Sequence, residues 1–233
     1  MIALKSLAVT GAGPYTLDLA GGAVLGLLAS RGDTAQGLLE ALGGARRHQG
    51  LVLVRGKPRR AGDVAYAPAE VEQILFGRTA AEAIGPRGQA YAARLAADHL
   101  LERSPQELSS GERRRLALAA VFGSGRPLLL FDRPTAGLDP QGQELFWRAA
   151  AEQTGVIVLT LVTPVEARHC SGILAVPGTG ELWPGGAIPA ERQRLAGWPP
   201  DQAADLAWTL GIKGDAKTLA EEVAAWRAGR RPR

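Results

Sequence analysis

The sequence is poor in the side chains that form disulfides and metal sites. Cys170 is the single cysteine, and the chain has three histidines that do not follow the close spacings of metal-binding clusters. No disulfide can therefore form within the chain, and we expect no metal cluster. Cys170 is then expected to be a small packing residue.

Long apolar runs are also missing. No stretch reaches the roughly 18–20 uninterrupted apolar residues of a membrane span, and the start of the chain lacks the basic and then apolar pattern of a signal peptide. We therefore expect a cytoplasmic chain. With 46% hydrophobic residues among 233, the chain can bury a substantial core, and its length fits one domain with an appendage.

The positive charge is modest and scattered. The formal net charge is +4, and aromatic residues make up 5% of the chain. Arginines cluster at 46–47, 59–60, 113–115 and near residue 230, without the continuous basic face and interleaved aromatics of a nucleic-acid site. We interpret these clusters as solvated surface and expect no nucleic-acid partner.

Short apolar runs separated by glycine and proline predict strands in the first third of the chain. These runs lie at 2–9, 15–19, 23–28, 51–54 and 64–66. From Thr79 the pattern becomes helical, because Thr79 and Glu82 have the spacing of a capping box. We therefore predict one domain over residues 1–190, with a helical part at about 79–122.

Residues 191–233 are expected to form a helical C-terminal extension. Two helices are predicted, at 201–210 and 218–227. Leu219, Val223 and Trp226 fall on one stripe of the second helix. We expect this stripe to pack on the domain, with contact between subunits as the alternative.

The most informative block is residues 108–139. It opens with LSSGE at 108–112, followed by basic and apolar residues that predict a helix. The apolar run 128–131 predicts a buried parallel strand that ends at Asp132, and PTAGLD follows at 134–139. In order and spacing this block resembles the signature motif, Walker B strand and D-loop of an ATP-binding-cassette (ABC) nucleotide-binding domain.

The resemblance implies an α/β fold of the P-loop NTPase (ABC ATPase) type, with a mixed or parallel sheet core, a small antiparallel part and an inserted helical subdomain. Asp132 stands where the family has its magnesium-associated carboxylate. Asp139 ends the loop that touches the opposite subunit in the family's dimers. We call residues 108–112 the signature segment and residues 134–139 the D-loop segment.

A phosphate loop of this family reads GxxxxGK[ST] between a strand and a helix. The glycines let backbone amides surround the phosphates, lysine neutralises charge, and the hydroxyl holds magnesium. Here the strand at 23–28 and a helix start at 38–42 are separated by residues 29–37, which we call the phosphate-loop segment. After Ala29, which replaces a glycine, this segment consists of Ser30, Arg31, Gly32, Asp33, Thr34, Ala35, Gln36 and Gly37.

Ala35 stands at the lysine position, Gln36 at the hydroxyl position, and Thr34 replaces the second glycine. Asp33 adds a negative charge where a triphosphate would lie, which is unfavourable. Arg31 is expected to be solvated, although it could offset that charge. We therefore predict that the segment does not hold ATP in the family's manner.

The general base is also missing. Arg133 stands where the family has a glutamate, and a guanidinium cannot accept a proton from the attacking water. We expect Arg133 to form an ion pair with Asp132 or with a residue of the D-loop segment, and contact with a phosphate is the alternative. Ala69 stands in the place of the Q-loop glutamine.

The switch histidine has no counterpart either. Residues 155–163 resemble the strand that precedes it, but Thr160-Leu161 and Thr163-Pro164, the two possible registers, contain no histidine. His169 comes too late in the chain and is expected on a helix surface.

The residues expected to face a partner subunit have been kept. In the family, ATP lies between the Walker A of one subunit and the signature of the other, so a chain can lose its own loop and still complete its partner's site. The resemblance assigns contact with the partner's nucleotide to Ser109, Ser110, Gly111 and Glu112, with Ser110 replacing a family glycine. The alternative is that this segment only caps a helix, since serine is a good N-cap and Glu112 suits the first turn.

Residues 73–79, QILFGRT, resemble the QLF…T stretch of ATPase subunits in energy-coupling-factor importers. We therefore expect a degenerate ATP-binding subunit of an ABC transporter, peripheral on the inner face of the plasma membrane. Its partners would be a competent ATPase subunit, which binds most of the ATP and Mg, and a transmembrane subunit. The alternatives are an active ATPase with unusual catalytic residues, and a nonhydrolytic scaffold or regulator.

Overall fold

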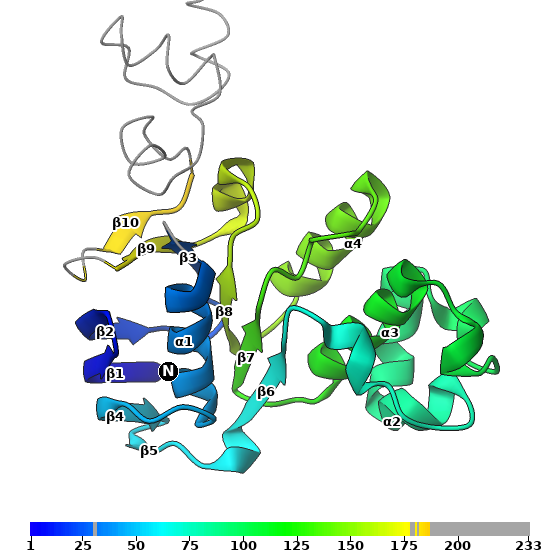
Figure 1. Ribbon diagram of the computed structural model, residues 1–233, viewed down its shortest axis with the longest axis horizontal. Helices are drawn as coiled ribbons and strands as arrows, with labels where there is room; N and C mark the ends of the chain where they lie inside the picture. Colours follow the sequence, from blue (N-terminus) through cyan, green and yellow to red (C-terminus); the bar gives the residue numbers. More distant parts are fainter. Residues whose placement is uncertain (30–31, 178–179, 181, 187–233) are drawn as a thin grey trace, which may run out of the picture.

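The computed structural model describes residues 1–29, 32–177, 180 and 182–186. It places two β-sheets on either side of helix α1 (Gly32–Gly43), with a separate lobe of helices beyond the larger sheet (Figure 1). The predicted C-terminal extension and the domain boundary at residue 190 lie outside the described residues.

The larger sheet is the centre of the molecule. Its strand order is β10-β9-β3-β8-β7-β6, and all neighbours pair in parallel except β10 and β9. The inner strands are short, continuous apolar runs that are buried on both faces, as expected for parallel strands. Their bounds are β3 Val24–Ala29, β6 Val64–Ala67, β7 Leu128–Phe131, β8 Val156–Thr160, β9 Gly172–Val176 and β10 Leu182–Pro184.

The smaller sheet is antiparallel, with the order β2-β1-β4-β5. One apolar cluster joins it to α1 and to the larger sheet, and Tyr15, Leu38 and Leu39 are fully buried in it. The strands are β1 Ile2–Val9, β2 Ala12–Leu19, β4 Gln49–Val54 and β5 Lys57–Pro58.

The helical lobe contains α2 (Ala80–Ala92) and α3 (Ser110–Gly123), and α4 (Pro140–Ala151) packs beside α3. The rings of Phe122 on α3, Phe131 on β7 and Phe146 on α4 have centroids 5.0–5.4 Å apart, so aromatic packing fixes the lobe to the sheet. Short 3-10 helices connect these elements at Ala61–Asp63, Val71–Ile74, Ala93–Leu95, Asp98–Leu100, Pro105–Glu107 and Pro164–His169.

The predicted strands and the start of the helical part are confirmed. Thr79 caps α2 by accepting a hydrogen bond from the Glu82 amide at 3.2 Å. The Glu82 carboxylate accepts from the amide of Arg78 at 3.0 Å, and hydrogen bonding to the amide of Arg78, followed by smaller effects that include the Thr79 amide, lowers the pKa of Glu82. α2 is also kinked at Gly85, which has a φ of 67° and precedes Pro86.

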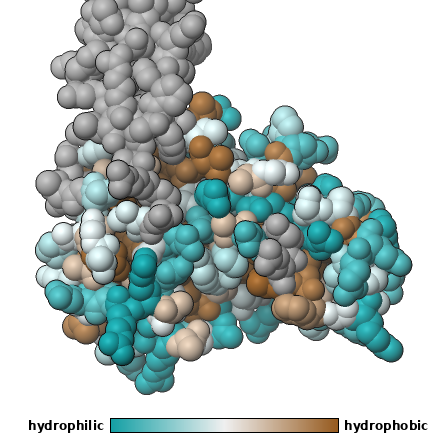
Figure 2. Space-filling model, viewed as in Figure 1, coloured by the Kyte–Doolittle hydropathy of each residue, from teal (hydrophilic) through white to brown (hydrophobic). Residues whose placement is uncertain are grey.

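Among the described residues, no helix combines the length and apolar character that crossing a membrane requires. Figure 2 shows hydrophobic atoms in small separate areas among hydrophilic ones on the viewed face.

Candidate functional site

The phosphate-loop segment is not the loop that the sequence predicted. β3 ends at Ala29 and α1 begins at Gly32, so residues 32–37 are helical and the predicted helix start at residue 38 is wrong. The physical reason is the loss of glycines: alanine and threonine do not need the left-handed conformations that a tight loop uses, and they continue regular structure. Ser30 and Arg31 lie outside the described residues.

The two positions that should bind phosphate and magnesium are occupied by side chains with other contacts. Ala35 is 1% exposed and belongs to the apolar cluster between α1 and the sheets. Gln36 lies on the exposed face of α1, where its Nε2 donates to Oε1 of Glu40 at 2.9 Å. Neither side chain can replace a lysine or a hydroxyl.

Mg-ATP therefore does not fit this chain's own phosphate-loop segment. The buried methyl of Ala35 supplies no positive charge for phosphates, and the Gln36 amide supplies no hydroxyl for magnesium. No step of ATP hydrolysis is assigned to this segment. Within the described part of the chain, no group of three or more His, Cys, Asp or Glu side chains is placed to hold a metal ion.

Asp132 lies at the end of β7, as predicted, but its carboxylate is engaged. It is 5% exposed, and its Oδ1 accepts a hydrogen bond from the Thr160 hydroxyl at 2.7 Å. The Thr160 oxygen in turn accepts from the backbone amide of Arg133 at 2.6 Å. Burial, followed by the negative charges of Asp132 and Glu40, raises the pKa of Tyr66 to about 12.

Arg133 does not form the expected ion pair with Asp132 or a residue of the D-loop segment in the described part of the chain. Its backbone is left-handed, with φ of 48°, and its side chain is exposed. The Asp132 carboxylate is buried whereas the Arg133 side chain lies on the surface, so the two charged groups do not meet. The alternative role, contact with a phosphate, stays a prediction.

The loop that follows β8 is held by Glu166 in the absence of a switch histidine. This carboxylate is 7% exposed, and its Oε2 accepts from the amides of Val162 and Thr163 at 2.6 and 3.2 Å. Its Oε1 accepts from the hydroxyl of Thr135. Glu166 therefore connects this loop to the D-loop segment.

Two further predictions from the sequence are confirmed in this region. His169 is exposed on the 3-10 helix Pro164–His169, where its ring stacks on Trp147 with centroids 4.6 Å apart. Burial and then the charge of Arg168 lower the pKa of His169. Cys170 is a buried packing residue, and burial, with a smaller effect of Glu166, raises the pKa of its thiol to about 12.

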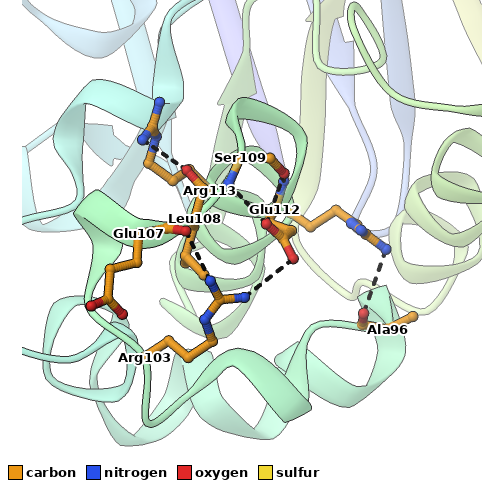
Figure 3. Close-up of polar contacts among 8 residues, drawn as sticks. Ala96, Arg103, Glu107, Leu108, Ser109, Glu112 and Arg113 are labelled. Atoms are coloured by element: carbon orange, nitrogen blue, oxygen red, sulfur yellow. Dashed lines mark hydrogen bonds and ion pairs between the residues drawn. The ribbon is translucent and has the colours of Figure 1, made fainter.

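The signature segment forms the start of α3 (Figure 3). Ser109 is the N-cap, and its Oγ accepts from the Glu112 amide at 3.3 Å. The Glu112 carboxylate accepts from the amide and the hydroxyl of Ser109, each at 2.8 Å, and lies 3.8 Å from Nη1 of Arg103. These contacts lower the pKa of Glu112, with the Ser109 amide as the largest cause. The capping role weighed for this segment is thus confirmed.

The signature and D-loop segments are neighbours in this chain. A Cβ placed on Gly111 would have the carbonyl oxygen of Gly137 as its nearest neighbour, at 4.0 Å. Asp139 at the end of the D-loop segment caps α4, because its Oδ1 accepts from the amide of Gly142 at 2.8 Å. Ser109, Ser110 and Asp139 are exposed, so the two segments present one surface.

The prediction that the arginines at 113–115 are solvated surface is wrong for Arg114. This side chain is 7% exposed and donates to three backbone carbonyls, of Ala69 at 3.0 Å, Arg133 at 2.7 Å and Pro134 at 3.2 Å. Arg113 donates to the carbonyl of Leu108 at 3.0 Å. The α3 helix places Arg114 against the sheet, which the run of three basic residues alone does not indicate.

Sequence reasoning thus missed Arg114, Thr160 and Glu166, the buried polar residues that fix residues 132–135. The one available signal was position: Thr160 ends a strand beside the strand that ends at Asp132. Parallel strands bring such ends to one edge of a sheet. For Arg114 and Glu166 no comparable signal exists, because their contacts depend on segments distant in the sequence.

A family model described as ABC transporter matches residues 24–136, from β3 to the D-loop segment. The energy-coupling factor transporter ATP-binding protein EcfA2 of Lactiplantibacillus plantarum is 38% identical over 101 residues, which cover 42% of this chain and 32% of that protein. EcfA2 of Mycoplasma mobile is 46% identical over 67 residues, which cover 27% of this chain and 22% of that protein. The chain thus matches a third or less of the length of these relatives.

The structural similarity to known proteins covers more of this chain than the sequence similarity does. The solved structure of cbiO1 from Clostridium perfringens, described as part of the ABC transporter complex cbiONQ, superposes with a TM-score of 0.68. The match covers 90% of this chain and 95% of that chain, at 17% identity. At that identity the likeness concerns the fold alone.

Proposed function

We propose that this chain, whose residues 24–136 match the ABC transporter family model, is a degenerate ATP-binding subunit that completes the ATP site of a partner subunit. Its signature segment would contact the nucleotide that the partner holds. ATP and Mg would then be bound mainly by that partner, and the pair would be a heterodimer. This chain would contribute no general base and hydrolyse no ATP alone.

The observation that carries this proposal is the contrast between two halves of an ABC site. The phosphate-loop segment has a buried alanine at the lysine position and a helix where the loop should be. The signature segment keeps an exposed helix start, and Gly111 lies beside Gly137 of the D-loop segment. The first-turn amides of α3 point out of the helix, and the helix dipole favours an anion there.

The second part of the proposal is coupling to a membrane protein through the helical lobe. Ile74 and Phe76, just before α2, are 42% and 80% exposed, although large apolar side chains are usually buried. Both belong to the stretch that resembles energy-coupling-factor subunits, and the curated relatives carry that name. We propose that these residues contact a transmembrane partner and that the chain lies on the cytoplasmic face of the plasma membrane.

One observation favours the alternative hypothesis that the chain is a nonhydrolytic scaffold. The capping box gives Ser109 and Glu112 a structural role that needs no nucleotide. The capping box does not involve Gly111, and a helix cap alone would not require the exposed D-loop segment beside it. Substitutions at Gly111 and in the D-loop segment therefore distinguish a nucleotide-contacting subunit from a scaffold.

Co-purification tests the proposal. This chain should be produced with a competent ABC ATPase subunit and a transmembrane protein encoded beside it, and ATP turnover should be measured for the chain alone, the partner alone and the complex. We expect turnover in the complex that exceeds that of the partner alone, and none from this chain. Turnover that is unaffected by this chain would favour a scaffold, whereas turnover by the chain alone would favour an active ATPase.

A further inference from the structure

Residues 132–135, between β7 and the rest of the D-loop segment, are fixed by buried polar side chains. The Thr160 hydroxyl binds the Asp132 carboxylate and the Arg133 amide. Glu166 accepts from the Thr135 hydroxyl. Arg114 donates to the carbonyls of Arg133 and Pro134. Each residue of this short loop therefore has at least one such contact.

Arg114 differs from the other two anchors because it comes from the helical lobe. Thr160 and Glu166 lie on β8 and the 3-10 helix after it, whereas Arg114 lies on α3, one turn after Gly111. Its guanidinium also reaches the carbonyl of Ala69, beyond the end of β6. One buried side chain thus connects the helical lobe to two loops at the edge of the larger sheet.

A guanidinium suits this role for a physical reason. It carries five N–H donors in a rigid planar fork, and its charge does not titrate in proteins. Buried backbone carbonyls need donors, and hydrogen bonds from a charged group are stronger than neutral ones. A lysine would keep the charge, but its compact ammonium cannot reach the carbonyls of Ala69, Arg133 and Pro134 in the same geometry.

One carbonyl that Arg114 binds also accepts a hydrogen bond within the turn of the D-loop segment. The carbonyl oxygen of Arg133 accepts from Arg114 at 2.7 Å and from the amide of Ala136 at 3.1 Å. The carbonyl oxygen of Thr135 accepts from the amide of Leu138 at 3.1 Å. The turn that brings Gly137 against Gly111 therefore rests on the backbone that Arg114 binds.

We propose that Arg114 is a positioning residue that joins the start of α3 to the D-loop segment, so that Gly111 and Gly137 move as one body. This proposal rests on the proposed function for its consequence in a complex, since it describes how the partner-facing surface is kept in shape without bound nucleotide. The positioning itself is a property of the free chain.

Amide hydrogen exchange in the full-length free chain tests the positioning. Arg114→Lys should raise the exchange rates of the Ala136 and Leu138 amides roughly tenfold or more, because a charge-assisted hydrogen bond to their turn is lost. The Asp132 amide, which donates to Ala67 in the sheet, should change much less. Arg115→Lys is the matched control, since Arg115 lies next to Arg114 on α3 and, within the part of the chain that the structure describes, donates to the Ala96 carbonyl at 3.5 Å and to no residue of the D-loop segment.

Arg114→Gln provides a second variant if Arg114→Lys does not fold, because a neutral amide lacks both the charge and the planar fork of the guanidinium. It should raise the exchange of Ala136 and Leu138 more than that of Asp132, because the Arg133 carbonyl, which also accepts from the Ala136 amide, loses its contact with Arg114. If neither variant raises exchange at Ala136 and Leu138 above the Arg115→Lys control, the positioning proposal is overturned. Exchange that rises equally throughout β7 and β8 would overturn it too, because the role would be general packing.

The complex separates this proposal from the proposed function. Arg114→Lys should lower the kcat of ATP turnover with little change in KM, because the partner binds most of the ATP. If exchange rises as expected but neither Arg114→Lys nor Gly111→Ala alters turnover, the proposed function fails and the positioning stands. If Gly111→Ala lowers turnover but Arg114→Lys changes neither exchange nor kcat, the positioning fails alone.

Discussion

Gly111 at the start of α3 lies beside Gly137 of the D-loop segment, and among the described residues the nearest neighbour of a methyl group added to Gly111 would be the Gly137 carbonyl oxygen, at 4.0 Å. Gly111 also has no left-handed φ, unlike Gly137 with φ of 75°. The chain itself therefore does not require glycine at position 111. A loss of ATP turnover on substitution of Gly111 would therefore be caused by a contact with a molecule outside this chain.

The purified chain should bind Mg-ATP feebly and hydrolyse none. Ala35 offers no charge, Gln36 offers no hydroxyl and Arg133 cannot act as a base. Isothermal titration calorimetry of the chain alone should give at most a weak, millimolar signal. Micromolar affinity would contradict this account of the phosphate-loop segment.

Restoring the lysine should destabilise the fold and not restore the site. Ala35 lies in the apolar cluster at 1% exposure, so Ala35→Lys must bury or displace an ammonium group, at a cost on the order of 3 kcal/mol of unfolding free energy. Denaturant unfolding measures this cost. Gln36→Ser is the matched control, because Gln36 is exposed and its substitution should change stability by about 0.5 kcal/mol or less. An Ala35→Lys variant as stable as this control would indicate a different start for α1.

The thiol of Cys170 should resist alkylation in the native state. Its pKa of about 12 keeps it protonated at neutral pH, and it is buried, whereas the thiolate is the reactive form. Since the folded-state pKa lies above the ordinary value of 9.0, the stability that this group contributes is complete below pH 9 and is lost as the pH rises towards 12. Iodoacetamide labelling followed by mass spectrometry should show slow native labelling and rapid labelling in denaturant. Equal rates would show that Cys170 is accessible.

Ser109→Ala should lower stability through the helix cap. Loss of an N-cap serine costs about 1 kcal/mol, and Ser110→Ala, at an exposed position one residue later, should cost less. The pKa of Glu112 is lowered from 4.5 in the folded state, so the contribution of the capping box is present above that pH and is lost as the pH falls below it. Thermal unfolding at neutral and acid pH measures both effects. Identical stability of the two variants at neutral pH would contradict the capping geometry.

The sequence predicted the strands of the first third of the chain and the strand at 128–131, because such apolar runs are buried, but it did not predict β9 or β10. It failed at the phosphate-loop segment because the loop was placed from the family's spacing, whereas β3 ends at Ala29 and α1 already begins at Gly32. It also failed at Arg114, since the carbonyl of Ala69 that it binds is 45 residues away along the chain. The motif order predicted the helix that begins at the signature segment, but it did not predict the buried polar contacts behind the D-loop segment.

The ATP turnover of Gly111 variants tests most directly whether the signature segment contacts a partner's nucleotide. In the active complex, Gly111→Ala would place a methyl group towards the phosphates. It should lower ATP turnover by roughly tenfold, which corresponds to about 1.4 kcal/mol in the activation free energy. Gly111→Asp should lower turnover further, because it adds a negative charge. Gly43→Ala is the matched control, because a Cβ there meets Leu130 at an ordinary 3.5 Å far from the signature segment. Thr34→Ala, in the chain's own phosphate-loop segment, should likewise have little effect.

The stability of each variant and its assembly with the partner should be checked by thermal unfolding and co-purification. We predict unchanged stability and assembly for Gly111→Ala, with turnover reduced by the two Gly111 substitutions and not by the Gly43→Ala and Thr34→Ala controls. Turnover equal to that of the unmodified complex for both Gly111→Ala and Gly111→Asp would contradict this prediction, and the signature segment would then be a helix cap within a scaffold.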